Sequence, residues 1–287
     1  MVRLRQKGWC RRMRICVVSF SPTGVTERLA QSVAKTLAAE LAGKACCGGA
    51  APHIERIPYT LPGERVELRF APEDVVIAAA PVYAGRLPNK LLPELQAKLA
   101  GSGTAALAVC TFGNRSCGEA LRELVLLLEQ NGFCPLGAAA FAVQHAFTGR
   151  VGTARPDAAD QSEIDRFARQ AAAKLEQGAA PLVVDHSPIG PYYTPLKADG
   201  TPAKFLKAKP VLDPARCDGC GRCAQCCPMG SIDPATHQTV GVCIKCQACI
   251  QTCPRGARSL ADPDFLSHVA MLEQNFAARR ADNVVLL

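Results

Sequence analysis

The sequence predicts an α/β fold in which a doubly wound, five-stranded parallel sheet of order 2-1-3-4-5 precedes a small, cysteine-rich α+β domain. Three observations support this. Short apolar runs alternate with helical patterns over residues 13–178, proline, glycine and lysine dominate residues 179–210, and cysteines crowd residues 211–262. Strands that alternate with helices and are apolar on both faces are typical of parallel sheets covered on both sides. Right-handed crossovers then favour the order 2-1-3-4-5.

The period of the apolar residues places the elements of the first domain. Runs rich in β-branched and small apolar residues predict strands at Ile15–Phe20, His53–Ile57, Val75–Ala80, Ala105–Thr111 and Leu136–Val143. Helical spacing predicts helices at Thr26–Leu41, Pro88–Ala100, Gly118–Gln130 and Pro156–Glu176. The second strand has the weakest pattern of the five.

The stretch 179–210 has no periodicity and reads as a linker. It carries Tyr192, Tyr193 and Phe205, and we expect these aromatic side chains to dock it on one of the domains. After the cysteine-rich domain, an amphipathic pattern predicts a helix at about Asp264–Arg280, within a C-terminal segment 263–287 that packs back on the protein.

Charge and composition exclude several classes of protein. The net charge of +8 is concentrated near the N-terminus, where six basic residues lie in the first fourteen positions, so a nucleic-acid-binding surface is not expected. The basic segment lacks the apolar run of a signal peptide, and we expect Met13 to be the natural start and the upstream residues to be an extension of the reading frame. No apolar run is long enough to span a membrane, so we expect a cytoplasmic protein. Sixteen cysteines in such a protein indicate metal binding rather than disulfides.

Eight of the cysteines form two copies of the pattern CxxCxxCxxxCP, offset by 26 residues at every cysteine. This spacing is typical of bacterial two-cluster ferredoxins, in which the fourth cysteine of each run binds the other cluster. It predicts one [4Fe–4S] cluster on Cys217, Cys220, Cys223 and Cys253, and a second on Cys243, Cys246, Cys249 and Cys227. Two zinc sites are the alternative, but a tetrahedral ion does not require three CxxC-spaced thiolates and a fourth before proline.

The remaining residues of this segment are expected to enclose the clusters. Cys226 is read as a spare thiol packed beside them. Apolar neighbours such as Ala224, Ile244, Ala248 and Ile250 favour a low dielectric and the lower part of the known potential range.

The loop SPTGVT follows the first predicted strand and opens a helix, which places backbone amides and the positive end of the helix dipole around a bound anion. It has neither the GxGxxG of a dinucleotide site nor the GK[ST] of a P-loop. A simple helix cap made by Ser21 or Thr26 is the alternative reading.

Within this loop, Ser21, Thr23, Gly24 and Thr26 match the SxTGxT signature with which flavodoxins bind the phosphate of FMN. Over about residues 13–262, the chain resembles the bacterial and archaeal fusions of a flavodoxin-like domain with a two-[4Fe–4S] ferredoxin. Two features depart from the flavodoxin pattern: Pro22 removes an amide donor, and Val25 replaces a polar residue.

The resemblance also implies a site for the flavin ring in the loops PVYAGRLP and TFGNRSCGEAL, which follow the third and fourth strands. Tyr83 would lie on the ring, and the amides of Ala84, Gly85, Gly113 and Asn114 would face it. Arg86 or Arg115 would offset charge on the reduced flavin. Cys117 stands near the position where an aromatic residue usually covers the second face.

Other candidates are less informative. His145, just past the fifth strand, is expected to be a hydrogen-bonded structural residue rather than a flavin contact. No ligand set is seen among the cysteines that occur singly or in a turn, which are Cys10, Cys16, Cys46, Cys47, Cys110 and Cys134.

Flavins exchange two electrons or one, whereas each cluster passes one, so the predicted function is electron transfer between FMN, two clusters and redox partner proteins. Two alternatives stay open: a flavin-dependent reductase of a quinone, nitro compound or nicotinamide, and a ferredoxin carrying a flavin-free interaction domain.

Overall fold

The computed structural model describes residues 13–287. The hypothesis of an upstream extension, like the basic N-terminal cluster up to Arg12, concerns residues that lie outside the described ones. The described helices are α1 (Val25–Leu41), α2 (Leu92–Lys98), α3 (Ala120–Gln130), α4 (Ala158–Gln177), α5 (Arg222–Gln225), α6 (Ala248–Gln251) and α7 (Pro263–Phe276), with 3-10 turns η1 (Ala45–Cys47) and η2 (Pro62–Glu64). The described strands are β1 (Arg14–Ser19), β2 (His53–Pro58), β3 (Leu68–Arg69), β4 (Val75–Pro81), β5 (Leu99–Ala100), β6 (Thr104–Phe112), β7 (Phe133–Ala142), β8 (Val211–Leu212), β9 (Arg258–Ser259) and β10 (Val284–Leu286).

The fold is α/β with a predominantly parallel central sheet of order β10-β7-β6-β4-β1-β2. The five predicted strands correspond to β1, β2, β4, β6 and β7, all mutually parallel where they pair. The sheet differs from the prediction by its sixth strand, because β10 pairs antiparallel with β7 at the edge. This strand has only three residues, too short a pattern to be recognised in the sequence.

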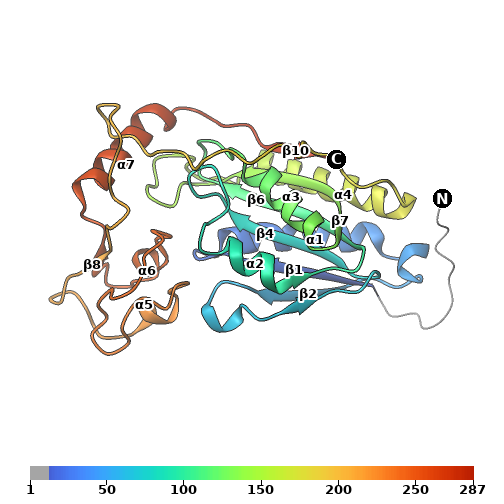
Figure 1. Ribbon diagram of the computed structural model, residues 1–287, viewed down its shortest axis with the longest axis horizontal. Helices are drawn as coiled ribbons and strands as arrows, with labels where there is room; N and C mark the ends of the chain where they lie inside the picture. Colours follow the sequence, from blue (N-terminus) through green and yellow to red (C-terminus); the bar gives the residue numbers. More distant parts are fainter. Residues whose placement is uncertain (1–12) are drawn as a thin grey trace.

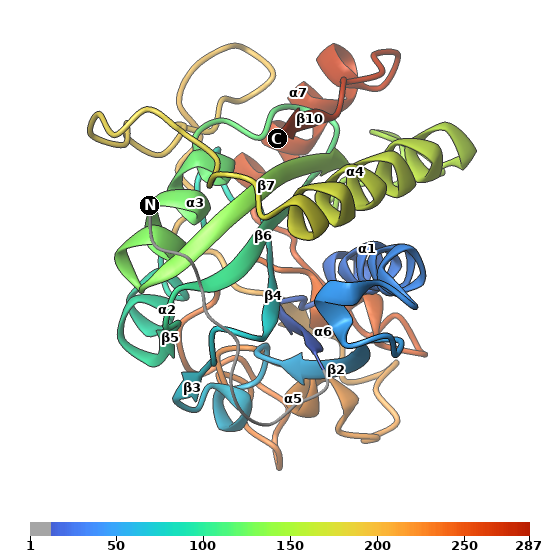
Figure 2. The same ribbon diagram turned by 90° about the vertical axis from the view of Figure 1, so that its right-hand side faces the viewer.

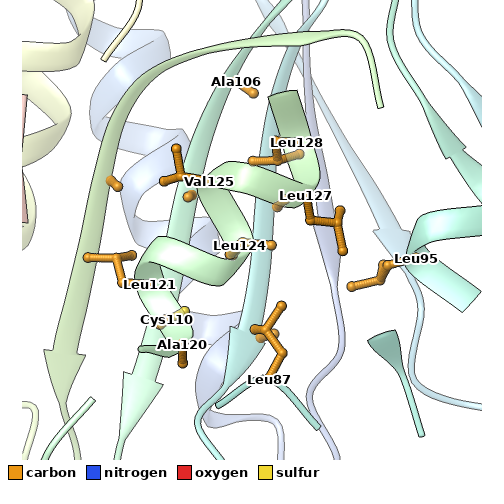
Figure 3. Packing of buried hydrophobic residues seen from close by; sticks show 14 of the residues in the cluster. Leu87, Leu95, Ala106, Cys110, Ala120, Leu121, Leu124, Val125, Leu127 and Leu128 are labelled. Atoms are coloured by element: carbon orange, nitrogen blue, oxygen red, sulfur yellow. The ribbon is translucent and has the colours of Figure 1, made fainter. Parts of the chain in front are cut away.

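Helices cover both faces of the sheet (Figure 2). On one face α1 and α4 pack together, and α1 turns Leu29, Val33 and Leu37 inward at helical spacing. On the other face α3 places Leu121, Leu124 and its neighbours over β6 and β7 (Figure 3). The strands carry alanine and valine on both faces, which lets the helices approach closely from either side.

Two helices are shorter than predicted, for identifiable reasons. The expected helix Pro88–Ala100 is reduced to α2, because Leu99 and Ala100 are extended and pair with Leu68 and Arg69 as β5 and β3. The C-terminal helix ends at Phe276 rather than Arg280. Beyond it the chain runs to the sheet edge, where it pairs as β10.

The linker docks through the three aromatic residues that the sequence singled out. The hydroxyl of Tyr192 donates to the carbonyl of Leu87 at 2.8 Å, and the amide of Tyr193 donates to Ala84 at 2.8 Å. Phe205 is buried and packs edge-on against Phe265 of α7, with ring centroids 5.5 Å apart. The expected docking is therefore confirmed.

The cysteine-rich segment, with α5 and α6, lies beyond the end of the sheet at which the parallel strands finish (Figure 1). This edge is where ligands bind in open α/β folds. None of the helices formed by residues 13–287 has the length and apolar character needed to cross a membrane.

Candidate functional site

Three loops meet at the carboxyl edge of the sheet, as the sequence predicts for a site at this place. The loop after β1 reaches the end of β6 through a hydrogen bond of 2.6 Å between the hydroxyls of Thr26 and Thr111. The loop after β4 joins there too, because the amide of Val82 donates to the carbonyl of Thr111 at 2.8 Å. The loops that carry the predicted phosphate and ring contacts therefore form one region.

The loop between β1 and α1 turns at Gly24, whose φ of 77° lies in the left-handed region that favours glycine. Ser21 acts partly as a cap, because its hydroxyl accepts the amide of Glu27 at 3.0 Å. In the part of the chain that the structure describes, the amides of Thr23 and Val25 donate to no protein acceptor. The N-terminus of α1 thus offers free backbone amides to an anion. It offers fewer hydroxyls than expected, because those of Ser21 and Thr26 already form hydrogen bonds within the protein.

Sequence reasoning missed one cation at this loop. A Cβ added at Gly24 would lie 2.8 Å from Nη1 of Arg28, so the guanidinium lies directly against the loop backbone. Arg28 is exposed and lies one helical turn after Gly24, a spacing that places two residues on the same face of a helix. That spacing is the signal that would have found it.

The loop after β4 forms a tight turn. Tyr83 and Arg86 exchange backbone hydrogen bonds of 2.9 and 3.1 Å, and between them Ala84 and Gly85 have positive φ angles of 49° and 77°. The turn touches the loop after β6, because a Cβ added at Gly118 would lie 2.5 Å from the carbonyl oxygen of Gly85. Only glycine allows these two backbones to approach so closely.

Four residues predicted to contact a flavin have other partners. Arg86 forms a buried ion pair with Glu123, so its charge is already neutralised. The guanidinium of Arg115 lies 3.5 Å from the ring centroid of Tyr193 in the linker. Gly113 lies against the ring of His145, which a Cβ would approach to 2.4 Å.

The fourth of these residues, Asn114, is fully buried and binds the C-terminal segment. Its side-chain amide donates to the carbonyl of Arg279 at 2.6 Å and accepts from Arg155 at 2.8 Å. Its own backbone amide donates to the carbonyl of Phe112, so that amide does not face an open site. The expectation for these four residues came from the position of the loops, because the segments that cover them have no local pattern in the sequence.

His145 is a structural residue, as expected. Its Nδ1 accepts the amide of Phe147 at 3.1 Å, and its ring meets that of Phe147 edge-on at 5.0 Å. Burial lowers the pKa of His145 to about 4, and the nearby cations His268 and Arg115 act in the same direction.

The cysteine-rich segment repeats its backbone at the offset of 26 residues that the sequence shows. Helices α5 and α6 occupy equivalent positions, and the residues before them, Gly221 and Gln247, have φ angles of 70° and 67°. The sulfurs of Cys227 and Cys253 each accept the amide four residues later, from Ser231 at 3.3 Å and Ala257 at 3.2 Å. The two runs are therefore structural copies as well as sequence copies.

A hollow with about 380 Å³ of empty space, part of it open to solvent, lies inside this segment. Its lining includes four cysteines, three from the second run and one from the first: Cys243, Cys246, Cys249 and Cys227. Burial raises the pKa of Cys246 to about 12, and the other three thiols act in the same direction, as expected for groups that share a site. The remaining lining is mainly apolar, with Pro228, Ile232 and Ile244 among its members.

The cysteines of the other predicted quartet are more exposed to solvent. Cys220 is exposed, and Cys217, Cys223 and Cys253 are partly buried. The sulfur of Cys217 lies 4.0 Å from Nδ1 of His237. Within residues 13–287, no group of three or more His, Cys, Asp or Glu side chains is arranged to hold a single metal ion.

The cysteines outside the quartets do not converge. Cys16 and Cys110 lie in the core on the central strands, and Cys47 contacts the sulfur of Met13 at 3.5 Å. Burial raises the pKa of Cys226 to about 12, and the neighbouring Cys249, Cys227 and Cys223 raise it further. The sulfur of Cys226 lies 3.5 Å from the carbonyl oxygen of Cys223.

Comparison with known proteins finds solved structures that are similar to part of this chain. No protein-family model matches the chain, and no curated protein matches it. A flavodoxin from the domain Archaea is 16% identical, with a TM-score of 0.37, covering 57% of this chain and 99% of its own. An oxidoreductase from Corynebacterium diphtheriae is 16% identical, with a TM-score of 0.40 and coverages of 58% and 96%. The NAD(P)H:quinone oxidoreductase from Methanothermobacter marburgensis is 12% identical, with a TM-score of 0.34 and coverages of 57% and 98%.

Proposed function

We propose that this chain is an electron-transfer protein that carries two [4Fe–4S] clusters and FMN. One observation carries the proposal: the hollow is lined by Cys227 from the first run together with Cys243, Cys246 and Cys249 from the second. This is the crossed set that two-cluster ferredoxin spacing requires, and a set of neighbouring cysteines within one run would not produce it. Four thiols on a mainly apolar wall fit the donor chemistry of an iron–sulfur cluster.

The second cluster is proposed on Cys217, Cys220, Cys223 and Cys253. Its support is the repeat itself, because the backbone of the first run copies that of the second, including the amide donated to the sulfur of the fourth cysteine. Hydrogen bonds to ligand sulfurs are among the features that set cluster potentials. We assign residues 211–262 to this ferredoxin domain, 13–178 to the flavodoxin-like domain, 179–210 to the linker and 263–287 to the C-terminal segment.

FMN is proposed at the carboxyl edge of the sheet. The free amides of Thr23 and Val25 and the guanidinium of Arg28 would hold its phosphate, with Ser21, Gly24 and Thr26 shaping the loop. Tyr83, Ala84 and Gly85 would line the ring. A flavin bound there supplies two-electron to one-electron exchange. Arg86, Asn114 and Arg115 are left out of this site, because they have other partners in the structure. The amide of Gly113 stays a proposed contact of the ring.

A ferredoxin with a flavin-free partner domain is the second candidate. The observation that favours it is the engagement of the hydroxyls of Ser21 and Thr26 and of both predicted arginines within the protein. In that case the sheet domain serves to hold and shield the clusters.

Cofactor content of anaerobically purified protein tests both candidates. Iron, sulfide and acid-released flavin are measured per chain before and after incubation with FMN. About eight iron with about one FMN supports the first candidate, and about eight iron without FMN supports the second. An iron content near two, with zinc or without it, contradicts both.

A pair of variants locates the flavin. Arg28→Ala should weaken FMN binding because it removes the cation beside Gly24. Arg69→Ala removes an equally exposed cation on β3 and is the matched control. Equal FMN affinity in the two variants would place the flavin elsewhere.

A further inference from the structure

The two halves of the cysteine-rich segment differ in their contacts with the sheet domain. Ile244, between Cys243 and Cys246, packs against the buried core on the α3 side of the sheet, as Val82 and Cys117 do. The carbonyl of Pro228, next to Cys227, accepts a hydrogen bond from the buried guanidinium of Arg65. The inner quartet, Cys227, Cys243, Cys246 and Cys249, is therefore flanked by residues that contact the sheet domain.

Further contacts surround the same quartet. The side chain of Gln251, two residues after Cys249 and two residues before Cys253, donates to the carbonyl of Ala146 at 3.2 Å. A Cβ added at Gly230 would lie 3.6 Å from Pro62 in η2. These contacts involve the loops after β2 and β7, so the inner quartet is held at the carboxyl edge of the sheet from more than one side.

The turn that carries Tyr83 shares a packing surface with the inner quartet. Tyr83 is partly exposed on the turn that the ring of a flavin would contact. Its neighbour Val82 and Ile244, which lies between Cys243 and Cys246, both pack against the core on the α3 side of the sheet.

The outer quartet consists of Cys217, Cys220, Cys223 and Cys253, and its first three cysteines have the opposite environment. Among the described residues, 213–226 form no hydrogen bond or ion pair with residues 13–178. Cys220 is exposed, and exposed arginines stand near these cysteines in the sequence at Arg216, Arg222 and Arg255.

We propose that the inner quartet holds the cluster that exchanges electrons with the flavin, and that the outer quartet holds the cluster that exchanges electrons with a separate one-electron carrier protein. This order rests on the proposed function, since it requires both clusters and FMN. It assigns a direction to the chain's own geometry: the turn at Tyr83, then Cys243 and Cys246, then Cys223 and the exposed Cys220.

The electrons balance within one chain. Oxidation of one reduced FMN releases two electrons, and each [4Fe–4S] cluster accepts one, passing from its 2+ to its 1+ state, while the flavin protons go to solvent. A two-electron donor such as a reduced nicotinamide restores the flavin. Two molecules of the carrier protein, each a one-electron acceptor, reoxidise the outer cluster in turn, and the inner cluster passes its electron to the outer cluster between these two steps.

Two cysteine variants test the order in the full chain. Iron and FMN are measured first, so that a failure of the proposed function is seen as missing cofactor before any kinetics. FMN is then photoreduced by a flash, and cluster bleaching is followed. Cys220→Ser should keep the rapid bleaching of the remaining inner cluster, and Cys246→Ser should lose the rapid phase although the outer cluster remains. Rapid bleaching in Cys246→Ser and its loss in Cys220→Ser would overturn the order.

A second pair of variants tests the same order of electron transfer if a cysteine variant fails to assemble its clusters. Arg222→Glu reverses an exposed charge beside Cys223, and Arg69→Glu makes the same change on β3. The probe is ferricyanide, an anionic one-electron acceptor, at low salt. Arg222→Glu should slow its reduction severalfold more than Arg69→Glu does, with the intramolecular rate unchanged in both. Equal slowing would contradict an exit at the outer cluster.

Discussion

Nη1 of Arg258 lies 4.0 Å from Sγ of Cys223, although the two residues belong to opposite ends of the cysteine-rich segment. The guanidinium is buried and donates to the carbonyl of His237 and the hydroxyl of Thr239 at 2.5 Å each. Burial raises the pKa of the Cys249 thiol, and the positive charge of Arg258 opposes this shift. A buried positive charge thus stands beside one predicted ligand of each cluster.

We expect Arg258→Met to lower the reduction potentials of the clusters, because a buried cation favours the more negative, reduced state. The measurement is an EPR-monitored redox titration of the anaerobic protein, with iron content determined in parallel. Arg255→Met is the matched control, since Arg255 is exposed in the same segment. A shift equal to that of the control, with full iron, would show that Arg258 does not tune the clusters.

The crossed ligand set makes a prediction about neighbouring cysteines. Cys227→Ala should remove the cluster built mainly from the second run, because Cys227 lines the hollow together with Cys243, Cys246 and Cys249. About four iron per chain should remain, with one EPR signal lost. Cys226→Ala, one residue away and not in the lining, should retain about eight. Loss of the Cys217-side signal in Cys227→Ala would instead show an uncrossed set.

The first domain could be predicted well because its signals are local. A short pattern in the sequence is enough to predict both an element and its buried face. Examples are the apolar run Ile15–Phe20 and the helical spacing of Leu29, Val33 and Leu37. The cysteine spacing predicts the crossed ligand set for a similar reason, because the register of the repeat specifies the fourth cysteine of each run, and this set stays a prediction. Elements decided by tertiary contact, such as the pairing of β3 with β5, leave no such pattern.

The flavin-ring residues show where sequence reasoning ends. The loops were placed correctly at the carboxyl edge, but the partners of their side chains come from residues far along the chain. Arg115 is covered by Tyr193 and Asn114 by the segment that follows Phe276, and neither contact has a sequence signal of its own. Conversely, the phosphate-loop pattern consists of hydroxyls and amides, so it does not include Arg28, which lies in α1 and reaches back to Gly24.

The ion pair of Arg86 and Glu123 is predicted to stabilise the fold rather than the charge of a cofactor. Glu123 is buried and Arg86 is only 14% exposed, and a carboxylate oxygen of Glu123 also accepts the amide of Leu87 at 2.8 Å. Arg86→Leu leaves a buried carboxylate without its cation and should cost about 3–5 kcal/mol in the free energy of unfolding. Urea denaturation measures this, and Arg69→Leu is the exposed control. A cost below about 1 kcal/mol would contradict the structural role.

Asn114 is predicted to hold the C-terminal segment on the sheet domain. Its side chain donates to the carbonyl of Arg279 and accepts from the amide of Ala281 at 3.1 Å. Asn114→Ala leaves these buried groups unpaired, at about 1–3 kcal/mol each. Hydrogen exchange of residues 277–286 should therefore become faster, while α1 keeps its protection. Unchanged exchange of that segment would show that β10 pairing alone holds it.

His145 is predicted to make stability fall as the medium becomes acidic. Burial lowers its pKa to about 4 in the folded protein, whereas the unfolded chain binds the proton near the ordinary pKa of about 6.5. Between these values the unfolded state binds more protons, so the free energy of unfolding rises with pH and is lost as pH falls. From pH 7.5 to about 5.5, the loss due to this residue should be about 1 kcal/mol.

The matched comparison uses two variants under urea, followed by circular dichroism on the anaerobic protein. His145→Asn keeps an acceptor for the amide of Phe147 without titrating, so its stability should depend less on pH than that of the native protein. His186→Gln changes an exposed histidine and should keep the native dependence. His268 faces the same aromatic cluster, and burial also lowers its pKa, so part of the dependence should remain in His145→Asn. If His145→Asn and the native protein lose equal stability, the buried imidazole is not the group that titrates.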